Sequence, residues 1–478
     1  MTNAYDEIAY PSACFRQTHP DRLAAHALLL GLTPAPIEAC RVLEIGAGDG
    51  SNLAPVALVY PEARFVGFDL AAEPVRRGIE SIDALGLRNI RLFQADILDV
   101  DRDGDLGDEP FDYIVAQGVY SWVPGGVRDA LMRLVRRRLA PGGVAYVSYN
   151  ALPGDYVRLA IRHDLLFAVR DIPGRTARVE AAMRRLQAWP PASAKQTSFQ
   201  RALAEEAAVM RRRSAASLAH DELADVYHPV YLSDFADHCA RNDLQIIAEA
   251  DPVDFGDWIV APDAPGTNEH DVVGRAQQND VAQIRFFRQS LLAPAGAKVR
   301  RRLEADVIGG MHVSSHARRG TGRRIECDGG ISFDLNDPPL VAVLERLAAL
   351  WPTTAPVASL GPDESRLMAL PWLYSHNAVE FHAAPSRFVT APGERPAASP
   401  LARMQAARGE TRLTTLRHTM ADVDDEFSRG FVATLDGTRT RAEIARDIAP
   451  HFNLAPEAAV GPLGVLLDIL ARTPLLVQ

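Results

Sequence analysis

The stretch RVLEIGAGDG, residues 41–50, constrains the fold of this chain more than any other segment. Its apolar start predicts a buried strand, and glycines follow at every second position, Gly46, Gly48 and Gly50. Alternating glycines after a strand predict a tight turn in which the backbone closely approaches another group. Because residues 51–60 can begin a helix, the stretch predicts a strand, a glycine loop and a helix. This is the nucleotide-approach unit of a doubly wound α/β sheet.

The residue types in this loop exclude two kinds of nucleotide site. A dinucleotide fingerprint needs a third glycine three residues after the second, and Ser51 occupies that position. A phosphate-binding P-loop needs a lysine, and this loop has none. What remains is Glu44 followed by spaced glycines, which resembles the first motif of class I S-adenosylmethionine-dependent methyltransferases. The alternative is a plain glycine turn after a buried strand.

The residues that follow alternate between strand and helix patterns. Strands are expected at 41–46, 64–69, 90–95, 111–117 and 143–149, and helices at 51–60, 72–85 and 126–140. Such alternation predicts βαβ units and a parallel sheet. The resemblance implies an α/β fold with a Rossmann-like core, a seven-stranded and mostly parallel sheet. It also implies a helical insertion and C-terminal winged-helix-like domains.

Changes in composition along the 478 residues divide the chain. Residues from 151 become rich in Ala, Arg and Leu, a strand pattern returns near 243, and APGERPAAS at 391–399 is a linker. We expect an N-terminal lid or helical segment (1–40), a cofactor-binding core (41–150), a helical insertion (151–242), completion of the core sheet (243–297), a middle winged-helix-like domain (298–390) and a C-terminal domain, mainly helical or winged-helix-like (400–478). In the middle domain, a helix at 363–372 and a strand-like stretch at 378–390 are expected.

Carboxylates end the second and third predicted strands. Asp69 lies about twenty residues after the glycine loop, the spacing expected of a ribose-binding acid; capping of the next helix is its alternative role. In the methyltransferase pattern, the acid at the position of Asp96 accepts a hydrogen bond from the adenine amino group. The resemblance thus implies a site for S-adenosyl-L-methionine made of Glu44, Gly46, Gly48, Gly50, Asp69, Leu70, Asp96, Ile97, Gln117 and Gly118.

Further segments resemble one subgroup of these methyltransferases. YPSACFRQTHPDRL precedes the glycine loop, GVYSWVP follows the fourth strand, and the stretch 226–252 and FFRQSLL lie downstream. They resemble methyltransferases with a methyltransferase regulatory domain, and in particular the bacterial outer-membrane-protein lysine methyltransferases. The resemblance covers most of residues 5–295 and, weakly, the tail. Four residues match motif positions of that family, Gln17, His19, Tyr120 and Trp122.

Aromatic residues follow the fourth and fifth strands, at the sheet edge where ligands bind, namely Tyr120, Trp122 and Tyr149. We expect these rings to line the acceptor channel, because aromatic walls hold a methylated cation and desolvation lowers the pKa of a lysine. Packing under the following helix is the alternative for Trp122. His19 is expected either to relay a proton or to hydrogen-bond the loop, and Thr18 or Asp21 to cap the helix that follows.

The composition of the chain limits the kinds of partner that we expect it to bind. A net charge of −10 argues against a nucleic-acid surface and is compatible with a basic substrate. Four scattered cysteines favour a reducing cytoplasm, and we expect no membrane insertion. No metal is expected, because His312 and His316 have helical ligand spacing without a third ligand. The Asp-Pro-Pro at Asp337 is interpreted as a helix start.

The sequence leaves several functions open. A protein-lysine methyltransferase is favoured by the resemblance, the acidic balance and the aromatic residues after the fourth strand. A small-molecule methyltransferase of natural-product type is the alternative. A third reading is a catalytically silent cofactor-binding protein whose appended domains bind a partner. A homodimer is also left open.

Overall fold

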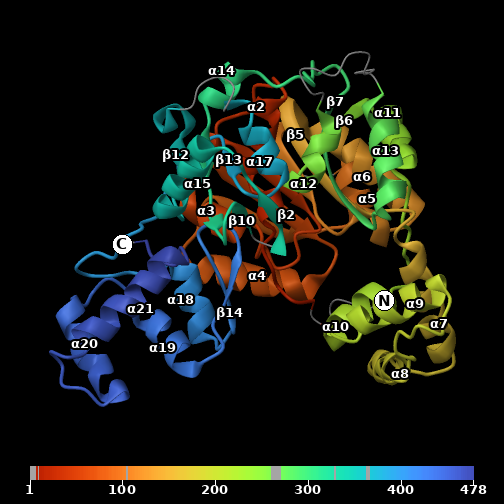
Figure 1. The fold of residues 1–478 in the computed structure, drawn as a ribbon. Coiled ribbons are helices and arrows are strands. Elements are labelled where there is room, and N and C mark those ends of the chain that lie inside the picture. The colour runs from red at the N-terminus through yellow and green to blue at the C-terminus, as the bar shows by residue number, and fades with distance from the viewer. Residues whose placement is uncertain are drawn as a thin grey trace.

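The computed structural model describes residues 7–8, 10–103, 106–259, 271–327, 330–361 and 367–477. Its centre is a seven-stranded sheet in the order β3-β2-β1-β4-β5-β7-β6 (Figure 1). The strands are β1 (Arg41–Ile45), β2 (Arg64–Asp69), β3 (Ile90–Gln94), β4 (Phe111–Ala116), β5 (Leu139–Asn150), β6 (Leu244–Glu249) and β7 (Phe287–Pro294). β1 to β5 pair in parallel, and β7 runs antiparallel to both of its neighbours. The predicted Rossmann-like fold class is confirmed.

Helices connect and cover these strands. They are α2 (Pro20–Leu29), α3 (Ala54–Val59), α4 (Ala72–Ala84), α5 (Ile97–Asp103), α6 (Gly125–Arg138), α11 (Leu232–Arg241), α12 (Pro252–Phe255) and α13 (Val272–Gln283). α4 packs closely under the glycine loop, because a Cβ on Gly78 would lie 2.4 Å from the carbonyl oxygen of Asp49. None of the helices in the described part of the chain is both long and apolar enough to cross a bilayer.

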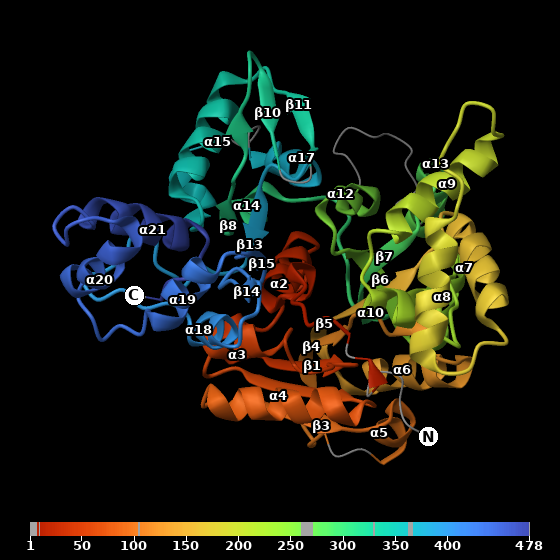
Figure 2. The ribbon, with the colours of Figure 1, turned by 90° about the horizontal axis from the view of Figure 1, so that it is seen from below.

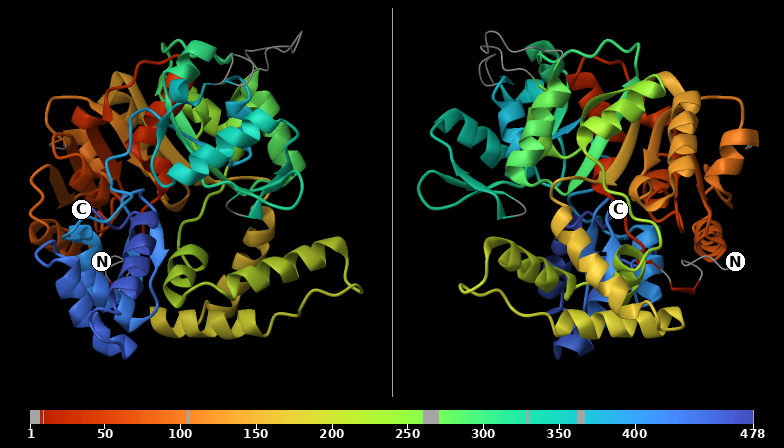
Figure 3. Two further views of the ribbon diagram at one scale, coloured as in Figure 1. Left: turned by 60° about the vertical axis from the view of Figure 1, so that its left-hand side comes forward. Right: turned by 90° about the vertical axis from the view of Figure 1, so that its right-hand side faces the viewer.

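The helices after β5 form a separate layer. They are α7 (Tyr156–Val169), α8 (Arg175–Gln187), α9 (Ser198–Met210) and α10 (Ala215–Ser217). Residues of α7, α8 and α9 share an apolar cluster of their own, which includes Ile161, Leu165 and Leu186. Figure 3 shows this layer at the same end of the molecule as the C-terminal unit. In Figure 2 the two lie on opposite flanks of the sheet. The region from 151 is therefore helical, as the composition predicts.

The middle part differs from its predicted form. It contains α14 (Ala305–Gly309), β8 (His312–Ser314), β9 (Arg318–Arg319), β10 (Arg324–Glu326), β11 (Ser332–Asp334), α15 (Pro338–Leu350), β12 (Ala355–Pro356), α17 (Leu370–Ser375) and β13 (Glu380–His382). The stretch 378–390 forms only the three-residue strand β13, which pairs with β8. The start of the predicted helix 363–372 lies outside the described residues. Asp337 caps α15 as predicted, accepting from the backbone N–H of Leu340 at 3.0 Å.

Apolar side chains of the middle part, such as Val313 and Leu344, belong to the same buried cluster as those of the sheet. The C-terminal residues have their own cluster, which includes Leu413, Phe431 and Leu467. That unit consists of α18 (Pro400–Ala407), β14 (Arg412–Thr414), β15 (Met420–Asp422), α19 (Glu426–Thr434), α20 (Arg441–Ile448) and α21 (Val460–Arg472). Figure 2 shows β14 and β15 beside α2, so the last unit of the chain reaches the first helix.

A buried carboxylate joins these parts. Glu380 in β13 is 1% exposed. It forms ion pairs with Arg22 of α2 at 2.5 Å, with Arg16 at 3.0 Å and with Arg417 of the C-terminal unit. The N-terminal segment, the middle part and the C-terminal unit therefore meet at one charged centre.

Candidate functional site

The glycine loop between β1 and α3 has a backbone that few other residues adopt. Gly46, Gly48 and Gly50 have φ angles of +76°, +53° and +71°. At Gly46 an added Cβ would also lie 2.6 Å from Cγ2 of Val119, so both conformation and space require glycine. A Cβ on Gly48 would have nothing within 4 Å, so the loop leaves open space beside its backbone there.

Glu44, near the end of β1, is a buried carboxylate with one satisfied oxygen. Its Oε1 accepts a hydrogen bond from Nδ2 of Asn52 at 2.7 Å. Its Oε2 is buried and has no hydrogen-bond partner among the described residues. Burial, partly offset by the Asn52 bond and reinforced by the charges of Asp49 and Asp69, raises the pKa of Glu44 to about 8. Because a buried acceptor without a partner is costly, this oxygen suits a donor brought by a ligand.

Asp69 ends β2 and faces the glycine loop. Its Oδ2 accepts from the backbone N–H of Gly48 at 2.9 Å, and its Oδ1 accepts from that of Ala71 at 2.8 Å. Burial raises its pKa, and these backbone bonds oppose the shift. A carboxylate can accept up to four hydrogen bonds, so Asp69 retains capacity for a ligand hydroxyl. The same side chain thus supports the start of α4 and can still accept a hydrogen bond from a ligand at the glycine loop.

The remaining predicted cofactor residues follow the neighbouring strands. Asp96 accepts from the backbone N–H of Leu98 at 2.8 Å, at the start of α5. Leu70 is 54% exposed and Ile97 is half-buried. The side chain of Gln117 contacts the Tyr146 hydroxyl at 2.5 Å, and Gly118 N–H donates to Ser148 Oγ at 2.8 Å. All of them follow the carboxyl ends of parallel strands, the edge at which such sheets bind ligands.

Negative charge gathers around this loop. Asp49 and Asp69 both act electrostatically on Glu44 and raise its pKa. A cationic ligand would relieve that repulsion, because opposite charge favours the ionised carboxylate. S-adenosylmethionine carries a sulfonium and an ammonium group, and its ribose hydroxyls match the open acceptor positions of Asp69. The residues of this edge therefore fit that cofactor.

The predicted acceptor-channel residues Tyr120 and Tyr149 lie in the core. They are 3% and 1% exposed, and both rings pack against Phe235 of α11. The Tyr120 hydroxyl lies 2.8 Å from Nδ1 of His238. That these rings line the acceptor channel stays a prediction; in this structure both are buried. The cause is α11, which covers both rings and whose His238 lies 118 residues after Tyr120.

Trp122 packs against the helical layer. Its ring lies 4.7 Å from that of Tyr227, and the guanidinium of Arg158 in α7 lies 5.7 Å from its centroid. Within the described residues, the Trp122 side chain makes no ring contact or hydrogen bond with Tyr120 or His19. The three residues predicted to act on the acceptor therefore occupy separate environments.

His19 caps α2 in place of the predicted Thr18 or Asp21. Its Nδ1 accepts from the backbone N–H of Asp21 at 3.1 Å. Burial lowers the pKa of His19 to about 4, so the ring is neutral near pH 7. It lines a cavity of about 50 Å³ together with Glu380 and Arg417. Its ring centroid lies 5.4 Å from that of His418. The structure thus places His19 at the charged centre around Glu380.

Sequence reasoning missed Asn52, which follows the glycine loop directly. Its Oδ1 accepts from the backbone N–H of Phe15 at 2.9 Å, and its Nδ2 donates to Thr18 Oγ1 at 3.0 Å. Ser51 Oγ also donates to the carbonyl of Ala13 at 3.1 Å. The N-terminal segment therefore lies against the loop. An amide next to the glycines was the only available signal in the sequence.

Glutamine at position 44 is expected to make the stability of the ligand-free protein less dependent on pH. The folded-state pKa of Glu44 is raised from its ordinary 4.5 to about 8. Its contribution to stability is therefore fully present below the lower value and is lost as the pH rises through the higher one. Thermal denaturation at about pH 5.5 and about pH 8.5 should show a larger gain from Glu44→Gln at the higher pH. Equal gains at both pH values, or an equal effect of the exposed Glu80→Gln, would contradict the raised pKa.

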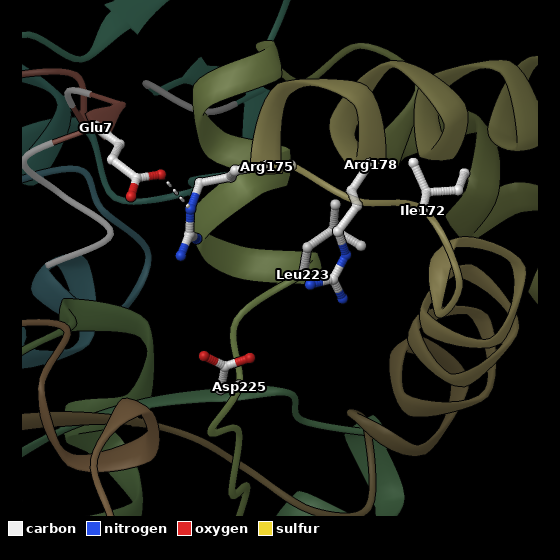
Figure 4. Close-up of a pocket in the computed structure, with 7 residues that line it drawn as sticks. Glu7, Ile172, Arg175, Arg178, Leu223 and Asp225 are labelled. Carbon is white, nitrogen blue, oxygen red and sulfur yellow. Dashed lines mark hydrogen bonds and ion pairs between the residues drawn. The ribbon is translucent and has the colours of Figure 1, made fainter. Parts of the chain in front are cut away.

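A larger cavity lies elsewhere in the molecule. It has a volume of about 320 Å³ and lies between the start of α8 and Glu7, where Arg175 pairs with Glu7 at 3.3 Å (Figure 4). The side chains of Arg175 and Arg178 both border this space (Figure 4). None of the predicted site residues lines it, so it is separate from the glycine loop.

Three known families match separate parts of the chain. A methyltransferase domain matches residues 43–145, a predicted methyltransferase regulatory domain matches residues 214–293, and the C-terminal winged helix domain of PKMT matches residues 394–454. The last match confirms the predicted winged-helix-like fold of the C-terminal unit.

Two proteins of Rickettsia prowazekii are similar to long stretches of this chain. Uncharacterized protein RP789 of Rickettsia prowazekii is 32% identical over 313 residues, 64% of this chain and 55% of that protein. Uncharacterized protein RP028 of the same organism is 30% identical over 245 residues, 51% of this chain and 96% of that protein. The chain thus spans about half the length of the first relative and nearly all of the second.

A solved structure has the same arrangement of domains. PKMT2 from Rickettsia typhi in complex with AdoHcy superposes with a TM-score of 0.82 at 22% identity, over 98% of this chain and 100% of that chain. At this identity the likeness shows a shared fold.

Proposed function

We propose that this chain, which belongs to the class I S-adenosylmethionine-dependent methyltransferases with a methyltransferase regulatory domain, transfers methyl groups to lysine side chains of proteins. The observation that carries the proposed chemistry is the acidic glycine-loop edge, where Glu44 Oε2 is buried without a partner among the described residues. Bound there, the cofactor supplies an electrophilic methyl group on its sulfonium.

In this proposal, different residues of the glycine-loop edge bind different parts of the cofactor. The free oxygen of Glu44 accepts from the ammonium end, and Asp69 accepts from the ribose hydroxyls. Asp96 and Ile97 hold the adenine, while Leu70 and the Gln117–Gly118 turn complete the walls. Open space beside Gly48 lets the ligand approach the loop backbone. The roles of Glu44 and Asp69 use acceptor positions that the protein's own bonds leave open.

The acceptor is the finer part of the proposal. The match of residues 394–454 to the winged helix domain of PKMT supports a protein substrate. A net charge of −10 favours a basic partner. A lysine must lose its proton before its nitrogen can attack the methyl group, and desolvation promotes that loss. Four cysteines that form no disulfide suit a reducing compartment, and we propose a cytoplasmic location.

Incubation with methyl-labelled S-adenosylmethionine is expected to label protein, and hydrolysis of that protein should release methylated lysine. The reaction is run in parallel with cell-envelope protein and with a small-molecule extract. Label found only in the extract would contradict the protein substrate and favour the natural-product alternative. Calorimetric binding of the cofactor with no transfer to either fraction would favour a silent cofactor-binding protein.

A further inference from the structure

One turn of the C-terminal unit reaches the glycine-loop edge. Residues 415–419 connect β14 to β15, and the Thr415 and Thr419 hydroxyls lie 2.7 Å apart. His418 occupies the turn with a φ of +59°, and its backbone N–H donates to the carbonyl of Thr415 at 3.1 Å. A left-handed conformation is unfavourable for a residue other than glycine, so the surrounding bonds must hold it. The turn is therefore built to present this imidazole in one orientation.

The imidazole of His418 meets Asn52. The His418 side chain is 1% exposed, and its Nε2 lies 2.8 Å from Oδ1 of Asn52 although 366 residues separate the two. The same Oδ1 accepts from Phe15 N–H, and the Nδ2 group donates to Glu44. The Thr18 hydroxyl lies 3.2 Å from Oδ1 and 3.0 Å from Nδ2. Because it donates its one hydrogen to the carbonyl of Phe15 at 2.7 Å, it accepts from Nδ2. An asparagine side chain offers two acceptor and two donor positions. All four are used.

This full set of partners fixes the orientation of the amide. Turning it over would place the NH₂ group against the backbone N–H of Phe15, so that two donors would face each other. His418 must then donate through Nε2, and a neutral ring that carries its proton there leaves Nδ1 unprotonated. That Nδ1 has no partner within the described residues, which agrees with the assignment. Burial also keeps the pKa of His418 well below its ordinary value.

We propose that His418 is a positioning residue for cofactor binding that acts through Asn52 on Glu44. The inference rests on the proposed function of the glycine-loop edge. By filling the second acceptor position of Asn52, His418 holds the amide so that its N–H engages Oε1 of Glu44. Oε2 then remains the oxygen available to the ligand. The winged-helix unit at the end of the chain thereby completes a site formed by its beginning.

Removal of the imidazole is expected to weaken binding of S-adenosylhomocysteine to the full chain. His418→Ala should raise the Kd about 5- to 10-fold, the effect of losing one buried hydrogen bond. His418→Gln should stay within about twofold of wild type, because its amide N–H can reach the position of Nε2. Asn52→Ala should weaken binding at least as much, and adding His418→Ala to it should have no further effect, because the histidine acts through the asparagine.

Two controls separate positioning from a general loss of stability. Leu467→Ala removes a buried side chain of the same unit and should lower the Tm without changing the Kd. Arg412→Ala, at an exposed pair with Asp422, should change neither. If His418→Ala does not fold, His418→Asn replaces it, since its shorter amide cannot reach Asn52 and should bind weakly.

The outcomes distinguish this inference from the proposed function. Failure of the wild-type protein to bind S-adenosylhomocysteine would overturn the proposed function itself. If the wild-type protein binds, and the folded alanine and asparagine variants bind with wild-type affinity, the role of His418 alone is overturned. The same holds if Leu467→Ala weakens binding as much as His418→Ala, or if glutamine fails to restore it.

Discussion

Replacing Glu380 with glutamine is expected to lower the free energy of unfolding by about 3–5 kcal/mol. Glutamine keeps the shape of the side chain but removes the negative charge. Arg22, Arg16 and Arg417 then lose the carboxylate that they contact in the folded protein. Breaking a buried ion pair from one side is costly, because the remaining charge has no water to stabilise it. Urea denaturation of the full chain, followed by tryptophan fluorescence, measures the loss.

The pH dependence of this effect has a definite sign. Burial raises the pKa of Glu380, but the charges of Arg22, Arg417 and Arg16 overcome it and hold the pKa well below the ordinary 4.5. The stability that Glu380 contributes is therefore present above that value and is lost as the pH falls through the folded-state pKa. The difference in the free energy of unfolding between the wild type and Glu380→Gln should therefore become smaller at acid pH.

A matched surface pair provides the control for Glu380. Glu345 is 52% exposed and pairs with Arg319 at 3.3 Å in the same middle part. Glu345→Gln should change stability by less than about 1 kcal/mol, because exposed ion pairs contribute little. Equal losses from the two substitutions would contradict a special role of the buried centre.

Replacing Asp69 with alanine is expected to weaken binding of S-adenosylhomocysteine about 10- to 100-fold. The substitution removes a carboxylate whose open positions are proposed to accept both ribose hydroxyls, and hydrogen bonds to charged groups are the stronger ones. It also removes the bonds to Gly48 and Ala71 that fix the loop relative to α4. Calorimetric titration measures the affinity, and thermal denaturation shows whether the fold is kept.

Two variants sharpen the test of Asp69. Asp69→Asn keeps one acceptor oxygen and should bind with intermediate affinity. Asp83→Ala removes an exposed carboxylate from the adjacent helix α4 and should leave the affinity unchanged. A folded Asp69→Ala variant with wild-type affinity would remove Asp69 from the proposed site.

The comparison of Tyr120 with Asp69 shows what kind of residue can be placed from the sequence. Asp69 ends a strand that its own neighbours define, so the βαβ order alone brings it to the ligand edge. Tyr120 also follows a strand, yet its ring is covered by Phe235 and His238 from a helix far along the chain. The residues next to an aromatic ring in the sequence do not decide whether the ring faces solvent or packs against another helix. Only the packing of α11 decides between them.

The sequence by itself determined the alternation of strands and helices, the glycine loop and the carboxylates that follow the strands, because periodicity and turn chemistry act over a few residues. The tertiary structure alone decided that His19 caps α2 beside Glu380, that Asn52 is fully bonded, and that His418 reaches it from 366 residues away. Those contacts depend on how distant segments pack. Burial sets their hydrogen-bond partners and pKa values, and burial is a property of the whole fold.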